Sequence, residues 1–366
     1  MKKIAILAND AASVINFRKE LIESFLEQGH EVHLCLPYGD ELDSLIEKGC
    51  KFHSITLKRR GKNLLSDIKL YAELKHLIGE IKPSIVLTYT IKLNLYGSLA
   101  ASKFKVPVIM NITGLGSSFQ QNNLLRKLLV KMYKLASRKV AYILFQNEEN
   151  LNFFQNENIV AQKKMKLISG SGVNISTHQY QEYKKEQLQE KKFIFVGRIM
   201  EEKGVLEFLE VAKRFQREEK TGISFHLYGK KEDNSINEVN KMVKEGAVRY
   251  HGPVSNINEV MKESYALVLP SYHEGMSNVL LENAALGRIG MASDIAGCHE
   301  IVEHRKTGFL FEMKNTEQMY NIILEVSRFN LETANKVGKA ARLKVERDFD
   351  RENICSLYND LINELI

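Results

Sequence analysis

The chain has 366 residues, of which 44% are hydrophobic and 27% charged, and its net charge is +7. This composition is typical of an ordinary globular protein of about two domains and excludes a disordered chain, and no apolar run approaches the ~20 residues of a membrane span. The four cysteines, at positions 35, 50, 298 and 355, form no CxxC pair. That spacing excludes a disulfide framework and a zinc site, and it fits a reducing cytosol.

The first half of the chain alternates short apolar runs with segments of helical period. Residues 1–8 resemble a signal peptide, but the apolar run is too short and Asn9-Asp10 follows it, so we interpret it as a buried strand of a cytoplasmic protein. Strands are predicted over residues 3–8, 31–36, 52–57, 84–88, 106–112 and 140–145. Continuous apolar runs separated by helices are typical of parallel strands covered on both faces. The pattern predicts a doubly wound α/β domain over residues 1–172.

A polar, Gly- and Ser-rich stretch over residues 169–191 interrupts this pattern and indicates a linker. Strands are then predicted over residues 193–197, 223–229, 248–251, 266–270 and 289–293, with helices between them. The sequence therefore predicts a second α/β domain over residues 173–345. Residues 346–366 are predicted as a C-terminal helix that returns to pack on the first domain.

Charge is unevenly distributed between the two halves. Residues 1–170 hold 25 basic and 15 acidic residues, and the segment 58–139 alone holds 16 basic and 3 acidic ones. Such asymmetry indicates an anionic partner for the first domain. Nucleic acid, a phosphorylated small molecule and an anionic membrane surface all satisfy it, and charge alone does not choose among them.

Two loops of the second half carry residue types suited to an anionic ligand. Gly197 ends a predicted strand, and Arg198 and Lys203 follow it, so two cations could neutralise a diphosphate without a metal. The other loop follows the strand that ends at residue 270. It runs through Glu274-Gly275-Met276 into a predicted helix that begins with Ser277-Asn278-Val279 and contains Glu282. Helix N-termini bind anions, and Glu282 could accept hydrogen bonds from a ribose diol. The alternative is that Glu274 is a loop charge and Glu282 a surface residue of an amphipathic helix.

Other motifs are weaker. Gly252-Pro253 predicts a tight turn whose backbone could contact a base edge, although a purely structural turn explains it as well. Asp348-Phe-Asp350 matches the DxD pattern of metal-binding transferases, but it lies at a helix junction rather than after an apolar strand. The ten histidines show no HxxxH or HExxH spacing. We therefore expect no metal site.

The loops of the second half, in this order and spacing, resemble those of the retaining glycosyltransferases of family 4, which have the GT-B fold. The resemblance rests on Gly197-Arg198, Lys203-Gly204, Gly252-Pro253 and the pair Glu274 and Glu282, and it continues through residues 290–294, 300–302 and 307–310. It implies two facing Rossmann-like domains. It also implies that Arg198 and Lys203 hold the donor diphosphate, that Glu274 contacts the donor sugar and that Glu282 binds ribose.

The first half resembles a narrower group, enzymes that add a sugar to an undecaprenyl-diphosphate-linked acceptor in capsule, O-antigen or glycoprotein-glycan assembly. The residues concerned are Asn16-Phe17-Arg18 and the segment 111–116, and N-acetylgalactosaminyltransferases on such lipids are most similar. Two departures stand out. Residues 9–13 replace the Gly pair that many members carry after the first strand, and residues 113–116 stand where many carry a His. No catalytic His is therefore assigned.

These observations together predict a retaining glycosyltransferase that needs no metal cofactor. It would move a hexose or N-acetylhexosamine from a nucleoside-diphosphate sugar, with UDP favoured, to a lipid-linked saccharide. Two alternatives stay open: a sugar-nucleotide 2-epimerase of the same architecture, and a nucleic-acid-binding protein, which would leave the second half unexplained.

The basic segment 122–139 predicts a helix with an apolar face that packs on the sheet, formed by Leu125, Leu128, Leu129, Met132 and Ala136. Five cations lie beyond that face, at positions 126, 127, 131, 134 and 138. Residues 58–62 would add to the same basic surface. We expect peripheral, salt-sensitive association with the cytoplasmic face of an anionic membrane, without insertion.

Overall fold

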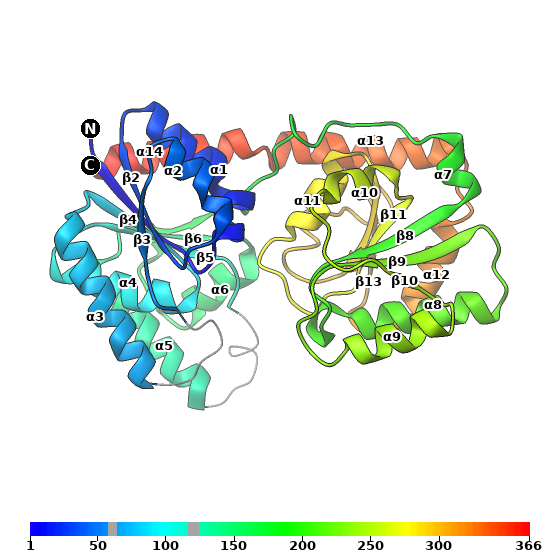
Figure 1. Cartoon of the computed structure of the whole chain (residues 1–366), viewed down its shortest axis with the longest axis horizontal. Coiled ribbons are helices and arrows are strands. Elements are labelled where there is room, and N and C mark those ends of the chain that lie inside the picture. The colour runs from blue at the N-terminus through cyan, green and yellow to red at the C-terminus, as the bar shows by residue number, and fades with distance from the viewer. Residues whose placement is uncertain (58–63, 116–123) are drawn as a thin grey trace. The chain divides into compact units, whose positions relative to one another are not determined.

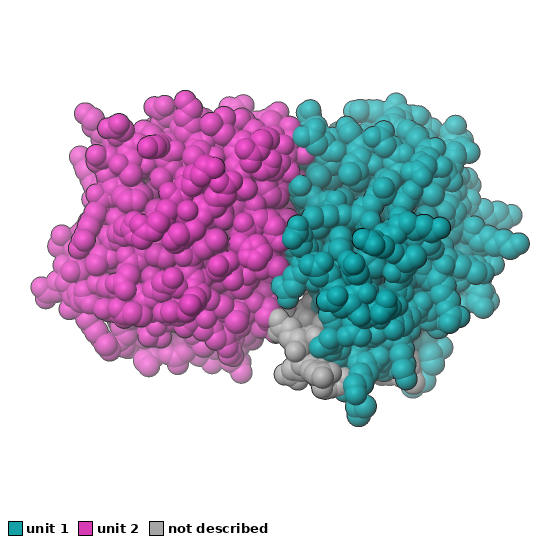
Figure 2. Space-filling model, turned by 180° about the vertical axis from the view of Figure 1, so that it is seen from behind, with its two compact units in different colours: residues 1–171, 351–366 teal, residues 172–350 magenta. Residues whose placement is uncertain are grey.

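The computed structural model describes residues 1–57, 64–115 and 124–366. Its contacts divide the chain into two compact units: unit 1, residues 1–171 with 351–366, and unit 2, residues 172–350. Figure 2 shows the two units in different colours. Each unit is a parallel sheet with helices on both faces, as the labels in Figure 1 allow the reader to follow. The predicted α/β class with two doubly wound sheets is confirmed.

The described residues of unit 1 form a sheet of seven strands in the order β3-β2-β1-β4-β5-β6-β7. The strands are β1 (Lys3–Leu7), β2 (Glu31–Leu36), β3 (Lys51–Ser54), β4 (Ile85–Tyr89), β5 (Val108–Ile112), β6 (Tyr142–Phe145) and β7 (Met165–Leu167). The chain order reverses between β1 and β4, which is the position where open α/β sheets bind ligands.

Strand side chains alternate between the two faces of this sheet and form a hydrophobic core on each. On one face Leu7 and Met110 pack with α3 (Leu64–Ile81), α4 (Ile91–Lys103), α5 (Leu124–Ala136) and α6 (Glu148–Asn156). On the other face Ile6 and Leu87 pack with α1 (Ala11–Glu27), α2 (Asp43–Glu47) and α14 (Arg351–Leu365). Both faces are therefore covered, which explains why the strands read as continuous apolar runs.

The last helix returns to unit 1, as predicted. The hydroxyl of Tyr358 on α14 donates a hydrogen bond to Asn111 Oδ1 on β5, and both residues are buried. Arg351 Nη1 donates to Glu20 Oε2 on α1 at 2.8 Å and to the carbonyl of Asn16 at 3.2 Å. Leu361 adds an apolar contact to the same core. Side chains from the end of the chain thus complete the first sheet's packing.

Unit 2 contains a second parallel sheet, in the order β10-β9-β8-β11-β12-β13. Its strands are β8 (Lys191–Val196), β9 (Ile223–Tyr228), β10 (Arg249–Tyr250), β11 (Ala266–Leu269), β12 (Ile289–Ser293) and β13 (Phe309–Phe311). Its helices are α7 (Lys185–Gln189), α8 (Val205–Arg217), α9 (Ile236–Lys244), α10 (Ile257–Glu263), α11 (Asn278–Ala285), α12 (Thr316–Val326) and α13 (Leu331–Asp348).

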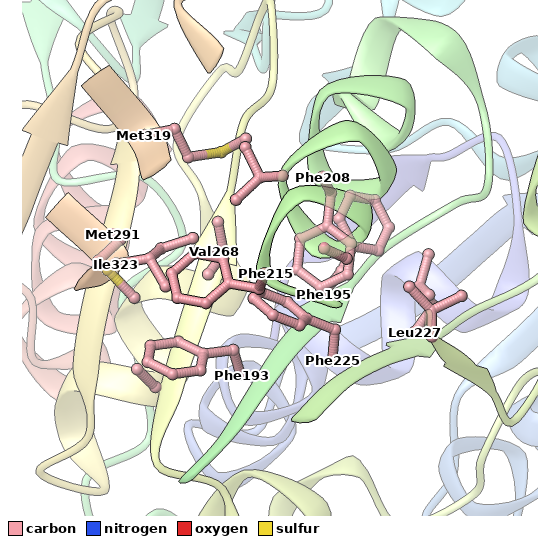
Figure 3. Packing of buried hydrophobic residues seen from close by; sticks show 14 of the residues in the cluster. Phe193, Phe195, Phe208, Phe215, Phe225, Leu227, Val268, Met291, Met319 and Ile323 are labelled. Atoms are coloured by element: carbon pink, nitrogen blue, oxygen red, sulfur yellow. The ribbon is translucent and has the colours of Figure 1, made fainter. Parts of the chain in front are cut away.

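Aromatic rings fill the core between the sheet of unit 2 and helices α8, α9 and α12 (Figure 3). The ring centre of Phe225 lies 5.7 Å from that of Phe193, 5.6 Å from that of Phe208 and 5.3 Å from that of Phe215. Packed rings of this kind resist deformation. This core fixes the strand ends that carry the candidate site.

The structure adds two short strands that the sequence pattern did not predict, β7 and β13, each at an edge of its sheet. It also corrects the buried face predicted for α5. The residues that α5 buries are Val130, Tyr133 and Ala136, with Leu129 and Met132 partly buried, whereas Leu128 is 53% exposed. The Tyr133 ring packs edge-on against Phe154, with ring centres 5.2 Å apart, and this contact turns that side of the helix inward.

Candidate active site

The loops that the sequence singled out in the second half follow strands of the unit 2 sheet. The segment with Arg198 and Lys203 follows β8, the segment with Glu274 follows β11, and Gly252 follows β10. Because the strands are parallel, these loops leave from the same edge of the sheet, the carboxyl edge. The structure thus brings the predicted site residues to one end of unit 2.

Gly204 ties the β8 loop to the β11 loop. It adopts φ +71° between a 3₁₀ turn, η5 (Glu201–Lys203), and the start of α8. A Cβ atom at this position would lie 1.9 Å from the carbonyl oxygen of Pro270, so only glycine fits. Tyr272 adds a second tie, because its N–H donates to the carbonyl of Glu202 at 2.9 Å and its hydroxyl to Glu207 Oε1 at 2.6 Å.

Lys203 and Glu274 form an ion pair across these two loops. Lys203 Nζ donates to Glu274 Oε1 at 2.6 Å, and the two side chains are only 18% and 12% exposed. The sequence assigned one residue to a diphosphate and the other to a sugar but did not predict this contact. The pair places a cation and a carboxylate where adjoining groups of one ligand would meet them.

Arg198 lies in the same loop but is less enclosed. Its Nη1 is 3.8 Å from Glu232 Oε1, and its side chain is 37% exposed. A long, exposed contact of this kind contributes little to stability. The guanidinium can therefore exchange this carboxylate for a ligand phosphate at small cost.

The N-terminus of α11 follows the Glu274 loop directly. Ser277 is its N-cap residue and accepts a hydrogen bond from Leu280 N at 3.4 Å, as the sequence predicted for a helix start. Asn278 and Val279 follow half-buried, as does Glu282 one turn later, while Met276 is buried. The helix dipole directs partial positive charge toward the loop.

A loop after β12 supports the Glu274 segment from behind, and the sequence reasoning did not assign it a role in the site. Ser277 N donates to the carbonyl of Gly297 at 2.9 Å. A Cβ on Gly297 would lie 2.8 Å from the carbonyl oxygen of Gly275 and 2.9 Å from Glu274 Cβ. Glu300 holds this loop by accepting the Gly297 N–H at 2.6 Å. This support depends on contacts within the folded chain, so no local sequence signal reveals it.

A second missed residue is Gly229, which directly follows β9. A Cβ there would lie 1.8 Å from the carbonyl oxygen of Gly197, whereas a Cβ on Gly197 would meet only the Phe195 ring, at 3.7 Å. Gly229 N also donates to the carbonyl of Gly252 at 2.8 Å. The tight backbone contact expected at Gly197 thus depends on the absence of a side chain at Gly229. The hydrogen bond from Gly229 to Gly252 also holds the turn that precedes the exposed Pro253.

Beside that turn, two histidines form a neutral pair. His226 Nδ1 lies 3.0 Å from His251 Nε2, and the His251 ring stacks on Tyr228 with centres 4.4 Å apart. Burial lowers the pKa of His226 to about 4, and the neighbouring His251 adds to the effect. Burial also lowers the pKa of His251. One ring must donate while the other accepts, so this arrangement requires an uncharged imidazole.

Among the described residues, no group of three or more His, Cys, Asp or Glu side chains is arranged to hold a metal ion. Asp348 of the DxD-like segment lies at the end of α13, where Arg347 and Lys344 contact its carboxylate. The hydrogen bond from Arg347 lowers the pKa of Asp348.

Comparison with known proteins identifies the family. The model named "Glycosyl transferase 4-like" matches residues 3–147, and the model named "Glycosyl transferases group 1" matches residues 190–328. Together they cover most of both units. The chain belongs to the glycosyltransferases of family 4.

Relatives of this glycosyltransferase match over most of its length. The N,N'-diacetylbacillosaminyl-diphospho-undecaprenol alpha-1,3-N-acetylgalactosaminyltransferase of Campylobacter jejuni is 26% identical and covers 99% of this chain and 100% of its own. The UDP-Gal:alpha-D-GlcNAc-diphosphoundecaprenol alpha-1,3-galactosyltransferase of Escherichia coli is 27% identical, covering 90% of this chain and 88% of its own. The Anabaena protein HepE, solved in complex with UDP and glucose, superposes with a TM-score of 0.81 at 14% identity, covering 100% of both chains. The GT-B fold is thereby confirmed.

We predict that acid weakens unit 2 through His226. Its pKa is about 4 in the folded chain and 6.5 when unperturbed. As the pH falls, the unfolded chain therefore takes up a proton at His226 before the folded chain does. The free energy of unfolding is highest above pH 6.5 and decreases as the pH falls from 6.5 toward 4. At pH 5 the expected loss is about 2 kcal/mol. Hydrogen exchange of the β9 amides between pH 7 and 5 would measure it. His226→Gln should flatten the dependence and the exposed control His76→Gln should not; equal slopes in all three proteins would contradict the prediction.

Proposed function

We propose that this glycosyltransferase moves a hexose or N-acetylhexosamine from a UDP-sugar to an undecaprenyl-diphosphate-linked saccharide, with retention of anomeric configuration, in surface polysaccharide or glycan assembly. The observation that carries the proposal is the partly buried Lys203–Glu274 pair beside the N-terminus of α11. Two relatives that match over 99% and 90% of this chain have names that specify undecaprenyl-diphosphate-linked acceptors, which supports the acceptor class. A protein of the same fold solved with UDP and glucose supports the donor.

In this proposal the cations act on the leaving group. Arg198 and Lys203 stabilise the charge that develops on the departing diphosphate, and the N-terminus of α11, at Ser277, Asn278 and Val279, adds its dipole. Because these groups are preorganised by backbone contacts, they need little rearrangement during the reaction. The residues present thus supply the positive charge that a metal ion provides in other transferases.

The remaining residues position the donor. Glu274 contacts the sugar, with Gly275 and Met276 shaping the loop around it, and Glu282 accepts hydrogen bonds from the ribose hydroxyls. The backbone near Gly197 approaches the diphosphate, and the exposed turn at Pro253 contacts the base. The Lys203–Glu274 contact supports this arrangement, because it places the proposed sugar-binding residue directly beside the proposed phosphate-binding residue.

Neither alternative function gains support. The relatives reported above are named as transferases and none as a sugar-nucleotide epimerase. A nucleic-acid-binding role would again leave the charged groups of unit 2 without a purpose. Release of free epimerised sugar nucleotide in the absence of acceptor would support the epimerase function instead.

The diphosphate role predicts a large kinetic effect. Arg198→Ala and Lys203→Ala should each lower turnover roughly 10²–10³-fold, because each removes a preorganised charge from the leaving group. Turnover on undecaprenyl-diphosphate-linked acceptors would be measured after a screen of UDP-, GDP- and ADP-sugars. Lys241→Ala, an exposed cation of α9, is the control and should be neutral. EDTA should leave turnover intact, and inhibition that magnesium reverses would reject the metal-free mechanism.

The two glutamates should be separable by calorimetry. Glu282→Gln should weaken the binding of UDP itself, because it removes a ribose contact. Glu274→Gln should spare UDP affinity and lower turnover, because the sugar is absent from UDP. Glu238→Gln on the exposed face of α9 is the matched control. Equal losses of UDP affinity in the first two variants would reject this division of roles.

The surface of α5 supports a membrane partner. Three of its leucines point outward: Leu124 is 84% exposed, Leu128 53% and Leu135 50%. Lys127, Lys131 and Lys134 are exposed on the same helix, and no ion pair with a described residue engages them. Arg126, which the sequence counted with these cations, is instead paired with Glu157 at 2.8 Å. The basic segment 58–62 lies outside the described residues.

We therefore infer that an anionic membrane surface is the partner of α5. Apolar side chains interleaved with lysines match a layer of acyl chains beneath negative headgroups, and each Lys near such a surface contributes about 1 kcal/mol. The exposed leucines modify the purely electrostatic expectation, because they can enter the headgroup region. No helix of the described residues is long and apolar enough to cross a bilayer.

Sedimentation with liposomes would test this partner. Wild-type protein should bind vesicles that contain phosphatidylglycerol and should largely dissociate at high salt. Replacing both Leu124 and Leu128 with Ser should lower binding about tenfold or more, since leucine burial is lost. Leu343→Ser, which changes an exposed leucine of unit 2, should have no effect. Binding that ignores lipid charge, or no binding at all, would contradict the proposal.

A further inference from the structure

Arg18 occupies a position of α1 at which the helical period places an apolar residue. The buried residues of this helix are Ala11, Val14, Leu21, Ile22 and Phe25. The interval between Val14 and Leu21 brings residue 18 onto the same face. The side chain of Arg18 is partly buried there, so its charge is partly removed from water. Such a placement is costly unless the guanidinium has a partner.

The protein supplies Arg18 with few partners. Its guanidinium carbon lies 4.6 Å from the centre of the Tyr89 ring, and Nη1 donates to the neighbouring carbonyl of Phe17 at 2.7 Å. Nε is buried without a hydrogen-bond partner. Among the described residues, no carboxylate lies within ion-pair distance of this arginine.

A second arginine beside α1 shows the contrast. Arg351 is more deeply enclosed, by the packing of α14 on α1, and the chain provides Glu20 for it at 2.8 Å. Glu20 lies only two residues from Arg18 in the sequence, yet it pairs with the other cation. Arg18 is thus a guanidinium whose fork has no anion within the described protein.

The surroundings of Arg18 are those of a ligand site. Tyr89 is the last residue of β4, and α1 follows β1, so the guanidinium lies toward the carboxyl edge of the unit 1 sheet. The edge between β1 and β4 is also the point at which strand order reverses. The Tyr89 hydroxyl is buried there and makes no hydrogen bond of ordinary geometry, although the side chains of Arg18 and Tyr358 lie close enough to interact with it. A hydroxyl and a cation therefore stand together, with no carboxylate of the described residues paired to the cation, where open α/β sheets bind ligands.

We propose that Arg18 and the Tyr89 hydroxyl bind the diphosphate of the lipid-linked acceptor. This assignment rests on the proposed function, which makes that acceptor a prenyl-linked diphosphate. A guanidinium binds two oxygens of a diphosphate in its planar fork, and the stacked Tyr89 ring holds that plane in place. The acceptor is thereby recognised by its charged linkage as well as by its sugar.

Farnesyl diphosphate is a soluble probe of this site. Its binding would be measured by calorimetry with UDP saturating, so that the donor site is filled, and compared with farnesol, which has the same chain without charge. Arg18→Gln should weaken farnesyl diphosphate about 10–100-fold, because a charge-assisted contact is lost. Arg18→Lys should weaken it less, and Lys19→Gln, which changes the adjacent cation, should leave it unchanged. Farnesol binding should be the same in all four proteins.

Two further measurements separate the outcomes. In the Arg18→Gln variant, UDP affinity should match that of the wild type, and so should the hydrogen exchange of the β4 amides. The first result would show that unit 2 is intact, and the second that the fold of unit 1 is intact. Unchanged farnesyl diphosphate affinity would overturn the proposal, and so would a loss of UDP affinity, which would assign Arg18 to the donor. A wild-type protein that binds UDP and transfers sugar but ignores farnesyl diphosphate would reject this inference alone. Failure to bind any nucleotide would reject the proposed function instead.

Discussion

The candidate active site depends on a contact between two backbones that leaves no room for a side chain. At Gly204 a Cβ would lie 1.9 Å from the carbonyl of Pro270, so the loop after β8 presses directly on the loop after β11. Lys203 precedes that contact and Glu274 follows it by four residues, and their side chains meet at 2.6 Å. The sheet and its loops therefore fix the positions of both backbones, so the two side chains meet without a large rearrangement.

The two units organise their charges differently. In unit 2 both candidate phosphate-binding cations face a carboxylate, Arg198 at 3.8 Å and Lys203 at 2.6 Å. An incoming diphosphate would thus exchange partners with existing charges, which lowers the cost of keeping these cations partly buried. In unit 1 the exposed lysines of α5 and the guanidinium of Arg18 have no such internal counterpart among the described residues. These groups account for part of the excess of basic over acidic residues in the first half of the chain.

The sequence predicted the parts of the fold that depend on long apolar runs. Strands β1, β4 and β11 are uninterrupted and buried, so pattern alone identifies them. It missed β7, whose three residues include Lys166, because a short edge strand carries little periodic signal. The site residues were identified by type and spacing, but Lys203 and Glu274 are 71 residues apart and nothing local shows that they touch. Gly229 was missed because its restriction comes from Gly197, which follows the neighbouring strand β8.

The packing of α14 has a consequence for how the protein is made. Tyr358, Leu361 and Ile362 belong to the hydrophobic core of unit 1 and lie at the end of the chain. During synthesis, residues 1–171 therefore leave the ribosome with one face of their sheet partly uncovered, while all of unit 2 is still to be translated. Unit 2 can finish folding before unit 1 does, although it is made later. Throughout that interval this face of the sheet lacks the apolar side chains that α14 supplies, so the nascent chain has an incomplete hydrophobic core.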